Sequence, residues 1–300
     1  MTAQQATYLR PRTLNEALHA LASAASDPST QFNVLAGGTD FYAARTGQPI
    51  LESILDITAV PELHGIADEG SQWRIGATTT WSDIVRMELP TQIAGQIAAQ
   101  FAAQFAGLQA AAREVGGIQI QNTGTVAGNI CNASPAADGI PALMALDAQV
   151  ELSSLSAKRI VPLTEFVLGS RKIARQPHEL VTGVLIPKRR NARSSFLKLG
   201  HRRYLVISIV MVAAVFEADE RGVITYAGIC VGSCSAVAKR LYSLEQKLVG
   251  KKIGDDMSTL ADEEDLAPLT PIDDVRGTGG YRRDAALTLV KRAIEEALHE

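Results

Sequence analysis

Residues 121–138 read Gln-Asn-Thr-Gly-Thr-Val-Ala-Gly-Asn-Ile-Cys-Asn-Ala-Ser-Pro-Ala-Ala-Asp, with no Lys or Arg. Asn, Thr and Ser side chains compete for backbone hydrogen bonds, and Gly adopts conformations that other residues avoid. The segment therefore predicts consecutive turns, and neither a helix nor a core strand. Such turns direct backbone N–H groups to one side, where an anion can bind. The ligand this pattern favours is a small phosphorylated molecule; the alternative is a surface loop without a ligand.

A second glycine segment lies upstream, where residues 32–41 read Phe-Asn-Val-Leu-Ala-Gly-Gly-Thr-Asp-Phe. The apolar run predicts a strand to Leu35, followed by a sharp turn. There is no G-x-G-x-x-G spacing and no Lys after a Gly, so neither a Rossmann fold nor a P-loop is supported. Two such turns could hold a pyrophosphate from two sides; the alternative is a bare hairpin turn.

Three motifs occur in order along the chain. They are Leu-Ala-Gly-Gly-Thr-Asp at 35–40, Asn-x-Gly-Thr-x-x-Gly-Asn-Ile at 122–130 followed by Ser134-Pro135, and Phe-Leu-Lys-Leu-Gly-His-Arg at 196–202. Together they resemble the FAD-binding medium subunit of the molybdenum hydroxylases, the family of xanthine dehydrogenase and aerobic carbon monoxide dehydrogenase. The resemblance spans about residues 7 to 297.

The resemblance implies an α+β fold in two domains. Residues 1–187 would form a two-lobed FAD-binding domain of the PCMH (vanillyl-alcohol-oxidase-like) type, with lobes at about 1–58 and 59–187. Residues 188–300 would form the C-terminal domain of the flavin subunit. Strand patterns at 195–199, 206–216 and 223–231, with helical patterns at 236–248 and 282–298, predict a three-stranded antiparallel sheet with helices on one face.

Local patterns predict further elements of the FAD-binding domain. Thr13 and Glu16 have the spacing of a capping box, which predicts a helix to about Ala25. Thr80 and Asp83 predict a second capping box, and residues 93–115 predict a long helix or a broken pair. Gly116-Gly117 would end that helix.

The family's FAD contacts carry over to positions of this chain that match its motifs. Residues Ala36 to Asp40 would line the pyrophosphate, and Thr125 and Asn129 would contact the diphosphate and ribityl region. Val181 would touch the flavin ring. The expected cofactor-binding residues are Val34, Leu35, Ala36, Gly37, Gly38, Thr39, Asp40, Phe41, Gly124, Thr125, Gly128, Asn129, Cys131, Asn132, Asp138, Val181 and Lys198.

Three of these positions leave alternatives open. Asp138 would accept from the adenine or ribose side of FAD, or cap a helix beginning near Ile140, or both. Lys198 would reach the carbonyl edge of the flavin ring, the alternative being a solvent-facing lysine. Ala127 stands where the family usually has a second glycine, which is tolerable if its φ angle is negative. No catalytic residue and no metal site are expected on this chain.

The implied function is electron transfer within a complex. A small partner would carry [2Fe–2S] clusters and a large partner molybdopterin, and FAD would deliver electrons to NAD+, oxygen or a quinone. Three cysteines, Cys131, Cys230 and Cys234, cannot supply four thiolates to a cluster on this chain. A dimer of heterotrimers is expected from the family. The alternatives are a stand-alone FAD-dependent reductase or oxidase, and a non-catalytic nucleotide-binding scaffold.

Composition limits the partners. The chain has 300 residues, a net charge of −3 and 46% hydrophobic residues, so a sizeable core is expected and a polyanionic partner is not. The basic run at 188–193 predicts a solvated linker or a docking surface, and nucleic-acid binding is not expected. Sparse cysteines and the absence of a secretory pattern predict a cytoplasmic protein. No apolar run is long enough for a membrane span.

Overall fold

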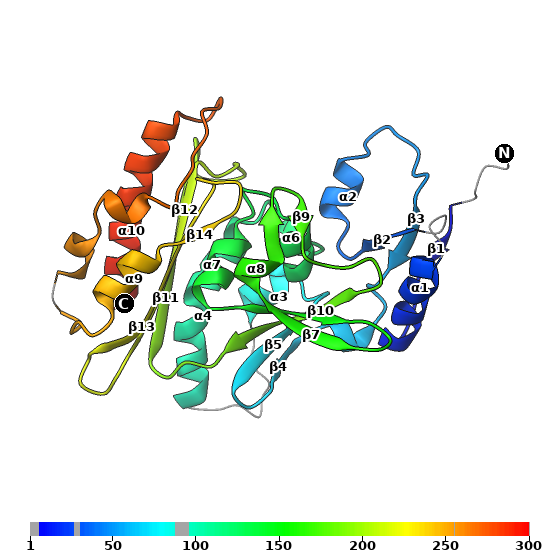
Figure 1. The fold of residues 1–300 in the computed structure, drawn as a ribbon, viewed down its shortest axis with the longest axis horizontal. Coiled ribbons are helices and arrows are strands. Elements are labelled where there is room, and N and C mark those ends of the chain that lie inside the picture. Colours follow the sequence, from blue (N-terminus) through cyan, green and yellow to red (C-terminus); the bar gives the residue numbers. More distant parts are fainter. Residues whose placement is uncertain (1–5, 27–30, 88–95, 255, 300) are drawn as a thin grey trace.

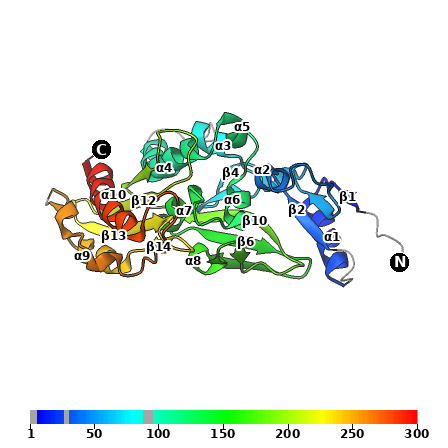
Figure 2. The same cartoon turned by 90° about the horizontal axis from the view of Figure 1, so that it is seen from above.

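The computed structural model describes residues 6–26, 31–87, 96–254 and 256–299. Figure 1 shows three parts in a row along the long axis, and the view from above in Figure 2 agrees. We refer to them as the first lobe (residues 6–58), the second lobe (59–187) and the C-terminal part (188–299). No helix among these residues combines the length and the apolarity needed to cross a bilayer.

The first lobe contains a small parallel sheet and one long helix. Its strands have the order β1-β3-β2: β1 (Tyr8–Leu9), β3 (Ser53–Asp56) and β2 (Phe32–Leu35). Helix α1 (Leu14–Ser26) buries Leu18 and Leu21, and α2 (Thr39–Ala43) follows Gly38. The helix expected over residues up to about Ala25 and the strand expected to end at Leu35 are both present, and residues 27–30 lie outside the described residues. The carboxylate of Glu16 accepts from the backbone N–H of Arg12 and not from Thr13, so the predicted capping box is formed only in part.

The second lobe is built on an antiparallel sheet with the strand order β4-β5-β10-β6-β7. The strands are β4 (Ile66–Asp68), β5 (Gln72–Gly76), β10 (Leu180–Pro187), β6 (Gln149–Ser153) and β7 (Lys158–Pro162). The helices are α3 (Trp81–Arg86), α4 (Gln96–Glu114), α5 (Ile118–Gln121), α6 (Val126–Asn132), α7 (Gly139–Ala145) and α8 (Leu163–Phe166). A hairpin of β8 (Val167–Gly169) and β9 (Lys172–Ile173) and the 3-10 turn η1 (Pro61–Leu63) complete it.

Two predictions for the second lobe are confirmed. Thr80 and Asp83 form a reciprocal capping box at the start of α3. The long helix predicted over residues 93–115 is α4 for residues 96–114, whereas residues 93–95 lie outside the described residues. Gly116, with a φ of 56°, follows α4 as expected of a helix-terminating glycine.

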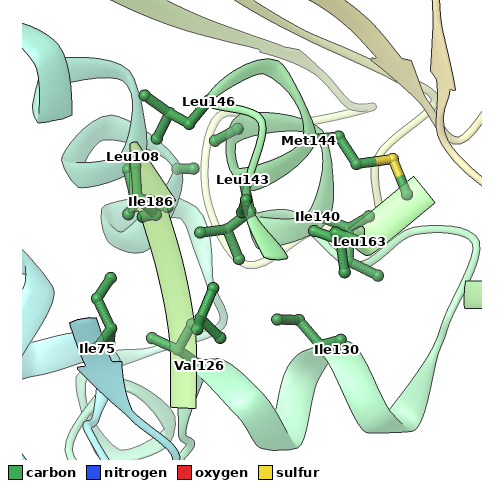
Figure 3. Close-up of a cluster of buried hydrophobic side chains, with 14 of the residues drawn as sticks. Ile75, Leu108, Val126, Ile130, Ile140, Leu143, Met144, Leu146, Leu163 and Ile186 are labelled. Atoms are coloured by element: carbon green, nitrogen blue, oxygen red, sulfur yellow. The ribbon is translucent and has the colours of Figure 1, made fainter. Parts of the chain in front are cut away.

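The prediction of turns without a helix at 121–138 is wrong. Residues 126–132 form α6, whose N-cap Thr125 accepts a hydrogen bond from the N–H of Gly128. Val126 and Ile130 are fully buried against α7, and Figure 3 shows both side chains in this core with Ile140 and Leu143. Burial of apolar side chains on one face therefore outweighs the low helix propensity of the Gly and Asn residues.

The C-terminal part contains a sheet of four strands, so the predicted three-stranded sheet is wrong by one short strand. The order is β11 (Ala192–Leu199), β12 (Val210–Ala218), β13 (Ile224–Gly232) and β14 (Lys239–Arg240). Strand β14 falls within the predicted helix 236–248, which begins only at α9 (Tyr242–Leu248). The remaining elements are η2 (Met257–Leu260), η3 (Glu264–Leu266) and α10 (Gly279–His299).

Both faces of this sheet are buried. On β12, Met211, Ala213 and Val215 belong to the core shared with the second lobe, whereas Val212 and Ala214 pack toward the core of α9 and α10. Alternate side chains of one strand thus join two cores. Helices of the C-terminal part cover one face as predicted, and α4 and α7 of the second lobe contact the sheet on the other.

The basic run at 188–193 is not a solvated linker. Lys188 pairs with Asp68 and lies over the ring of Trp73, and Arg189 pairs with Asp147 at 2.5 Å. These contacts tie the segment to the second lobe, and Ala192 is already the first residue of β11. Two of the four cations are therefore paired within the chain, whereas Arg190 and Arg193 are exposed, so a docking surface stays a prediction.

Candidate functional site

A cavity of about 620 Å³ lies between the two lobes. The first lobe contributes residues of β2, of the turn at 36–38 and of α2. The second lobe contributes residues around α6, the segment after β9 and the start of β10. The volume is in the range of sites that hold a cofactor-sized ligand. The two glycine segments of the sequence thus face the same space.

The two glycine segments meet backbone to backbone. A Cβ on Gly37 would lie 1.8 Å from the carbonyl oxygen of Thr123 and 2.9 Å from the Cα of Gly124. Gly38 has a φ of 69° at the N-cap of α2, a conformation that favours glycine. Glycine is therefore required at 37 by space and favoured at 38 by backbone conformation.

Helix α6 forms the wall opposite the first lobe. Thr125, Gly128 and Asn129 line the cavity along its first turn. Ala127 also lines it, and lies within the helix, so its methyl group causes no backbone strain. An alanine at 127 is therefore tolerated where the family usually has a second glycine.

Asn129 is one of the polar residues that line the cavity. Its Oδ1 atom has no hydrogen-bond partner among the described residues, but that atom is fully covered and lies beside Gly139, away from the open space. The fit to a dinucleotide therefore rests on the close approach at Gly37, which leaves no room for a Cβ between the two glycine segments.

Most of the residues predicted to bind the cofactor line this cavity. They are Val34, Leu35, Ala36, Gly37, Gly38, Thr39, Asp40, Phe41, Gly124, Thr125, Gly128, Asn129, Cys131, Asn132 and Val181. Of the predicted set, Asp138 and Lys198 are outside the lining. Lys198 contacts Glu114, and the next residue, Val115, belongs to the lining. Binding of FAD by any of these residues stays a prediction.

Asp138 and Lys198 form a buried ion pair beside the cavity. Lys198 Nζ lies 3.0 Å from Asp138 Oδ2 and donates to the carbonyl oxygen of Glu114 at 3.2 Å. Ser208 donates to the other carboxylate oxygen at 2.7 Å. Burial raises the pKa of Asp138, and Lys198 and Ser208 oppose this effect.

Two of the alternatives for these residues are wrong. The side chain of Lys198 is 6% exposed, so the lysine does not face solvent. Asp138 is the N-cap of α7 but makes no capping hydrogen bond, because its carboxylate is engaged by Lys198 and Ser208. The chain brings these groups together from three separate segments.

The sequence did not predict three arginines of the lining, Arg45, Arg171 and Arg175. None lies in a glycine motif. Arg171 follows Gly169-Ser170 in the hairpin of β8 and β9, and Arg175 follows that hairpin. A basic residue in a glycine-containing turn was the available signal, but only the fold places that turn beside α6.

Cys131 offers a chemical test of the cavity. Burial raises the pKa of its thiol to about 11, so at pH 8 we expect alkylation by iodoacetamide about 100-fold slower than for an unshifted thiol. The rate should rise about tenfold per pH unit until the pH approaches that pKa, because the thiolate is the reactive form. Peptide mass spectrometry measures the labelling. Added FAD should slow it, and fast labelling at pH 8 that FAD leaves unchanged would contradict the placement.

Comparison with known proteins identifies related chains. Residues 3–189 match the family model described as FAD binding domain in molybdopterin dehydrogenase, and residues 195–297 match the CO dehydrogenase flavoprotein C-terminal domain. The nicotinate dehydrogenase FAD-subunit of Eubacterium barkeri is 32% identical over 250 residues, covering 81% of this chain and 79% of that one. The xanthine dehydrogenase FAD-binding subunit of Escherichia coli O157:H7 is 27% identical over 298 residues, covering 98% and 96%.

A solved structure is also similar over nearly the whole chain. It is the carbon monoxide dehydrogenase of Hydrogenophaga pseudoflava that lacks the Mo-pyranopterin moiety of the molybdenum cofactor. The TM-score is 0.83 at 27% sequence identity, with 99% of this chain and 98% of that chain covered.

Proposed function

Since this chain belongs to the family of FAD-binding domains in molybdopterin dehydrogenases and is an FAD-binding oxidoreductase subunit, we propose that it relays electrons within a multi-chain hydroxylase. The observation that carries the proposal is the contact of the two glycine segments in a cavity of about 620 Å³. This geometry suits a dinucleotide held between lobes.

Individual residues have proposed roles in holding FAD. Gly37 and Gly38 let the backbone approach the diphosphate, and Thr125 with Asn129 contact the diphosphate and ribityl region. The apolar side chains of Val34, Leu35, Phe41 and Val181 contact the adenosine or the ring. Lys198, which is paired with Asp138, has the proposed role of interacting with the carbonyl edge of the ring. What supports that role is its contact with the carbonyl oxygen of Glu114, the neighbour of the lining residue Val115.

The bound cofactor would supply electron transfer in steps of one or two electrons, which suits a junction between one-electron carriers and a two-electron acceptor. This chain's residues would bind it and shield it from water. Among the thiols, Cys230 and Cys234 are buried in the C-terminal part and Cys131 lines the cavity. Three thiols so placed cannot hold a [2Fe–2S] cluster.

We therefore assign the iron–sulfur clusters to a small partner chain. We further propose that a large partner chain carries molybdopterin. The proposed assembly is a dimer of heterotrimers in the cytoplasm. NAD+ is the proposed final acceptor, with oxygen or a quinone as the alternatives to be tested. The names of the related chains, which are subunits of dehydrogenases, support a multi-chain assembly.

The proposal includes a division of the chain. Residues 1–187 form the FAD-binding domain, with lobes at 1–58 and 59–187, and residues 188–300 form the C-terminal domain. The two family matches, which end at residue 189 and begin at residue 195, support this boundary. The two lobes on either side of the cavity support the PCMH (vanillyl-alcohol-oxidase-like) type.

The test is isolation of the chain from its own cells with an affinity tag under gentle conditions. We expect a yellow complex with about one FAD per chain, together with iron, molybdenum and two further chains. The tagged chain produced alone should bind FAD and contain neither metal. Absorption spectra and elemental analysis measure both. A colourless chain that takes up no FAD would refute the proposal, and turnover of a substrate by the isolated chain would favour a stand-alone flavoenzyme.

A further inference from the structure

The charged residues that line the cavity have a net positive charge. Arg45, Arg171 and Arg175 lie on its wall with one carboxylate, Asp40. Three positive charges and one negative charge leave a formal +2, whereas the whole chain has a net charge of −3. The cavity is thus positively charged in a chain that is negative as a whole.

One of the three arginines is already neutralised within the chain. Arg45 donates to Glu52 Oε1 from Nε at 3.0 Å and from Nη2 at 2.7 Å, and its Nη1 donates to the carbonyl oxygen of Phe41 at 3.1 Å. Its guanidinium also lies 3.9 Å from the centre of the Phe41 ring. These contacts order the segment after α2, and they leave Arg45 with little free charge for a ligand.

Arg171 and Arg175 differ from Arg45. Neither guanidinium lies within 4.0 Å of a carboxylate in the part of the chain that the structure describes. Arg171 Nη1 donates to the side chain and the carbonyl oxygen of Asn132. Arg175 Nη1 donates to the carbonyl oxygens of Gln176 and Glu179, at 3.2 Å and 2.8 Å. Each guanidinium is therefore held in place by neutral oxygens through one nitrogen, and its charge is not compensated by a carboxylate.

The backbone conformation and one backbone hydrogen bond fix the position of Arg171. Arg171 has a φ of 60°, a conformation that favours Gly or Asn, and its N–H donates to the carbonyl oxygen of Ala133 at 2.9 Å. A bulky residue in the left-handed region costs energy and is found where the surroundings require it. The hairpin turn is thus anchored directly on the end of α6, next to Asn132.

Arg175 lies on the same wall of the cavity as Arg171. Its charge lowers the pKa of Cys131 against the larger opposing effect of burial, so the guanidinium is close to a residue of α6 that lines the cavity. Two cations with no described carboxylate within 4.0 Å therefore line the cavity near the C-terminal end of α6, beside Cys131 and Asn132. A guanidinium matches a phosphate group in geometry as well as in charge.

We propose that Arg171 and Arg175 supply the positive charge that binds the diphosphate of the dinucleotide, an inference that rests on the function proposed above. A diphosphate diester is a dianion, and the glycine segments contain no Lys or Arg to neutralise it. Backbone donors of those segments fix its position, and the two arginines from the hairpin provide the charge. Binding then depends on a segment outside both glycine motifs.

The experiment titrates the full chain, freed of flavin, with FAD and follows the quenching of flavin fluorescence. Arg171→Gln and Arg175→Gln should each raise the Kd about fivefold and the double variant about 20-fold, moderate effects because both side chains are partly open to solvent. Raising NaCl from about 50 to about 500 mM should weaken binding to the unmodified chain several-fold and to the double variant much less. ADP should lose affinity with the double variant, and adenosine should not.

Lys172→Gln is the matched control, since Lys172 is exposed on the same hairpin and is not part of the lining. It removes the same charge and should leave the Kd within about twofold. Arg171→Lys keeps the charge and should retain the salt dependence, which separates charge from folding if Arg171→Gln perturbs the hairpin.

The outcomes distinguish this inference from the function it rests on. Failure of the unmodified chain to bind FAD would refute the function. If that chain binds FAD and the double variant matches Lys172→Gln in Kd and salt dependence, the role of the arginines is refuted alone. An effect of the double variant on NADH binding without one on FAD would also refute it.

Discussion

Gly37→Ala should abolish retention of FAD during purification and raise its Kd at least about 100-fold, equivalent to about 2.7 kcal/mol. The added Cβ would lie 1.8 Å from the carbonyl oxygen of Thr123, so the two glycine segments must separate. Backbone atoms cannot rotate away as a flexible side chain can, and the walls of the cavity would move apart together. Absorption spectra of the purified chain and titration with FAD measure the effect.

Gly280→Ala is the control for this change. Gly280 lies in the first turn of α10, and a Cβ there would meet nothing within 4 Å. This variant should bind FAD like the unmodified chain. Circular dichroism shows whether Gly37→Ala is folded, and a folded Gly37→Ala chain with unchanged FAD content would contradict the role of the backbone contact.

Arg240→Met should lower the free energy of unfolding by about 3–5 kcal/mol, because it leaves a buried carboxylate without its partner. Arg240 lies on β14 and is 4% exposed. It donates to both carboxylate oxygens of Glu245, at 2.5 and 2.8 Å, and to Asp147 at 2.7 Å. Asp147 follows α7, so this arginine joins the C-terminal part to the second lobe. The midpoint of urea unfolding measures the loss.

Arg221→Met serves as the comparison. Arg221 pairs with Asp219 in a turn and its side chain is 85% exposed, so its loss should change the free energy of unfolding by less than about 0.5 kcal/mol. The difference between the two variants tests whether burial of an ion pair, and not its mere presence, determines its effect on the free energy of unfolding. Equal midpoints for the two variants would show that the Arg240 network contributes no more than a surface pair.

Features that depend on neighbouring residues could be predicted from the sequence. The capping box of Thr80 and Asp83, the strand ending at Leu35 and the glycine after α4 all follow from contacts within a few residues. Much of the cavity lining was predicted in a different way, from the resemblance of the glycine segments to the motifs of a family. Local geometry constrains caps, strand ends and helix ends before the chain folds, whereas the lining was implied by the resemblance.

Features that depend on burial could not be predicted in this way. Helix α6 forms because Val126 and Ile130 pack against α7, a contact that propensity does not include. Strand β14 forms because Lys239 and Arg240 pair with Val231 and Cys230 on β13. In both cases a tertiary contact outweighed the local preference.

The sequence alone determined the family and the positions of the two glycine segments, because motif spacing is a property of short stretches. The tertiary structure alone decided which charges meet. It paired Lys198 with Asp138 across 60 positions, and it placed Arg171 and Arg175 on the cavity wall with no carboxylate within 4.0 Å in the described part of the chain. Electrostatic interactions depend on distance and burial in space, and neither quantity can be read from the order of residues.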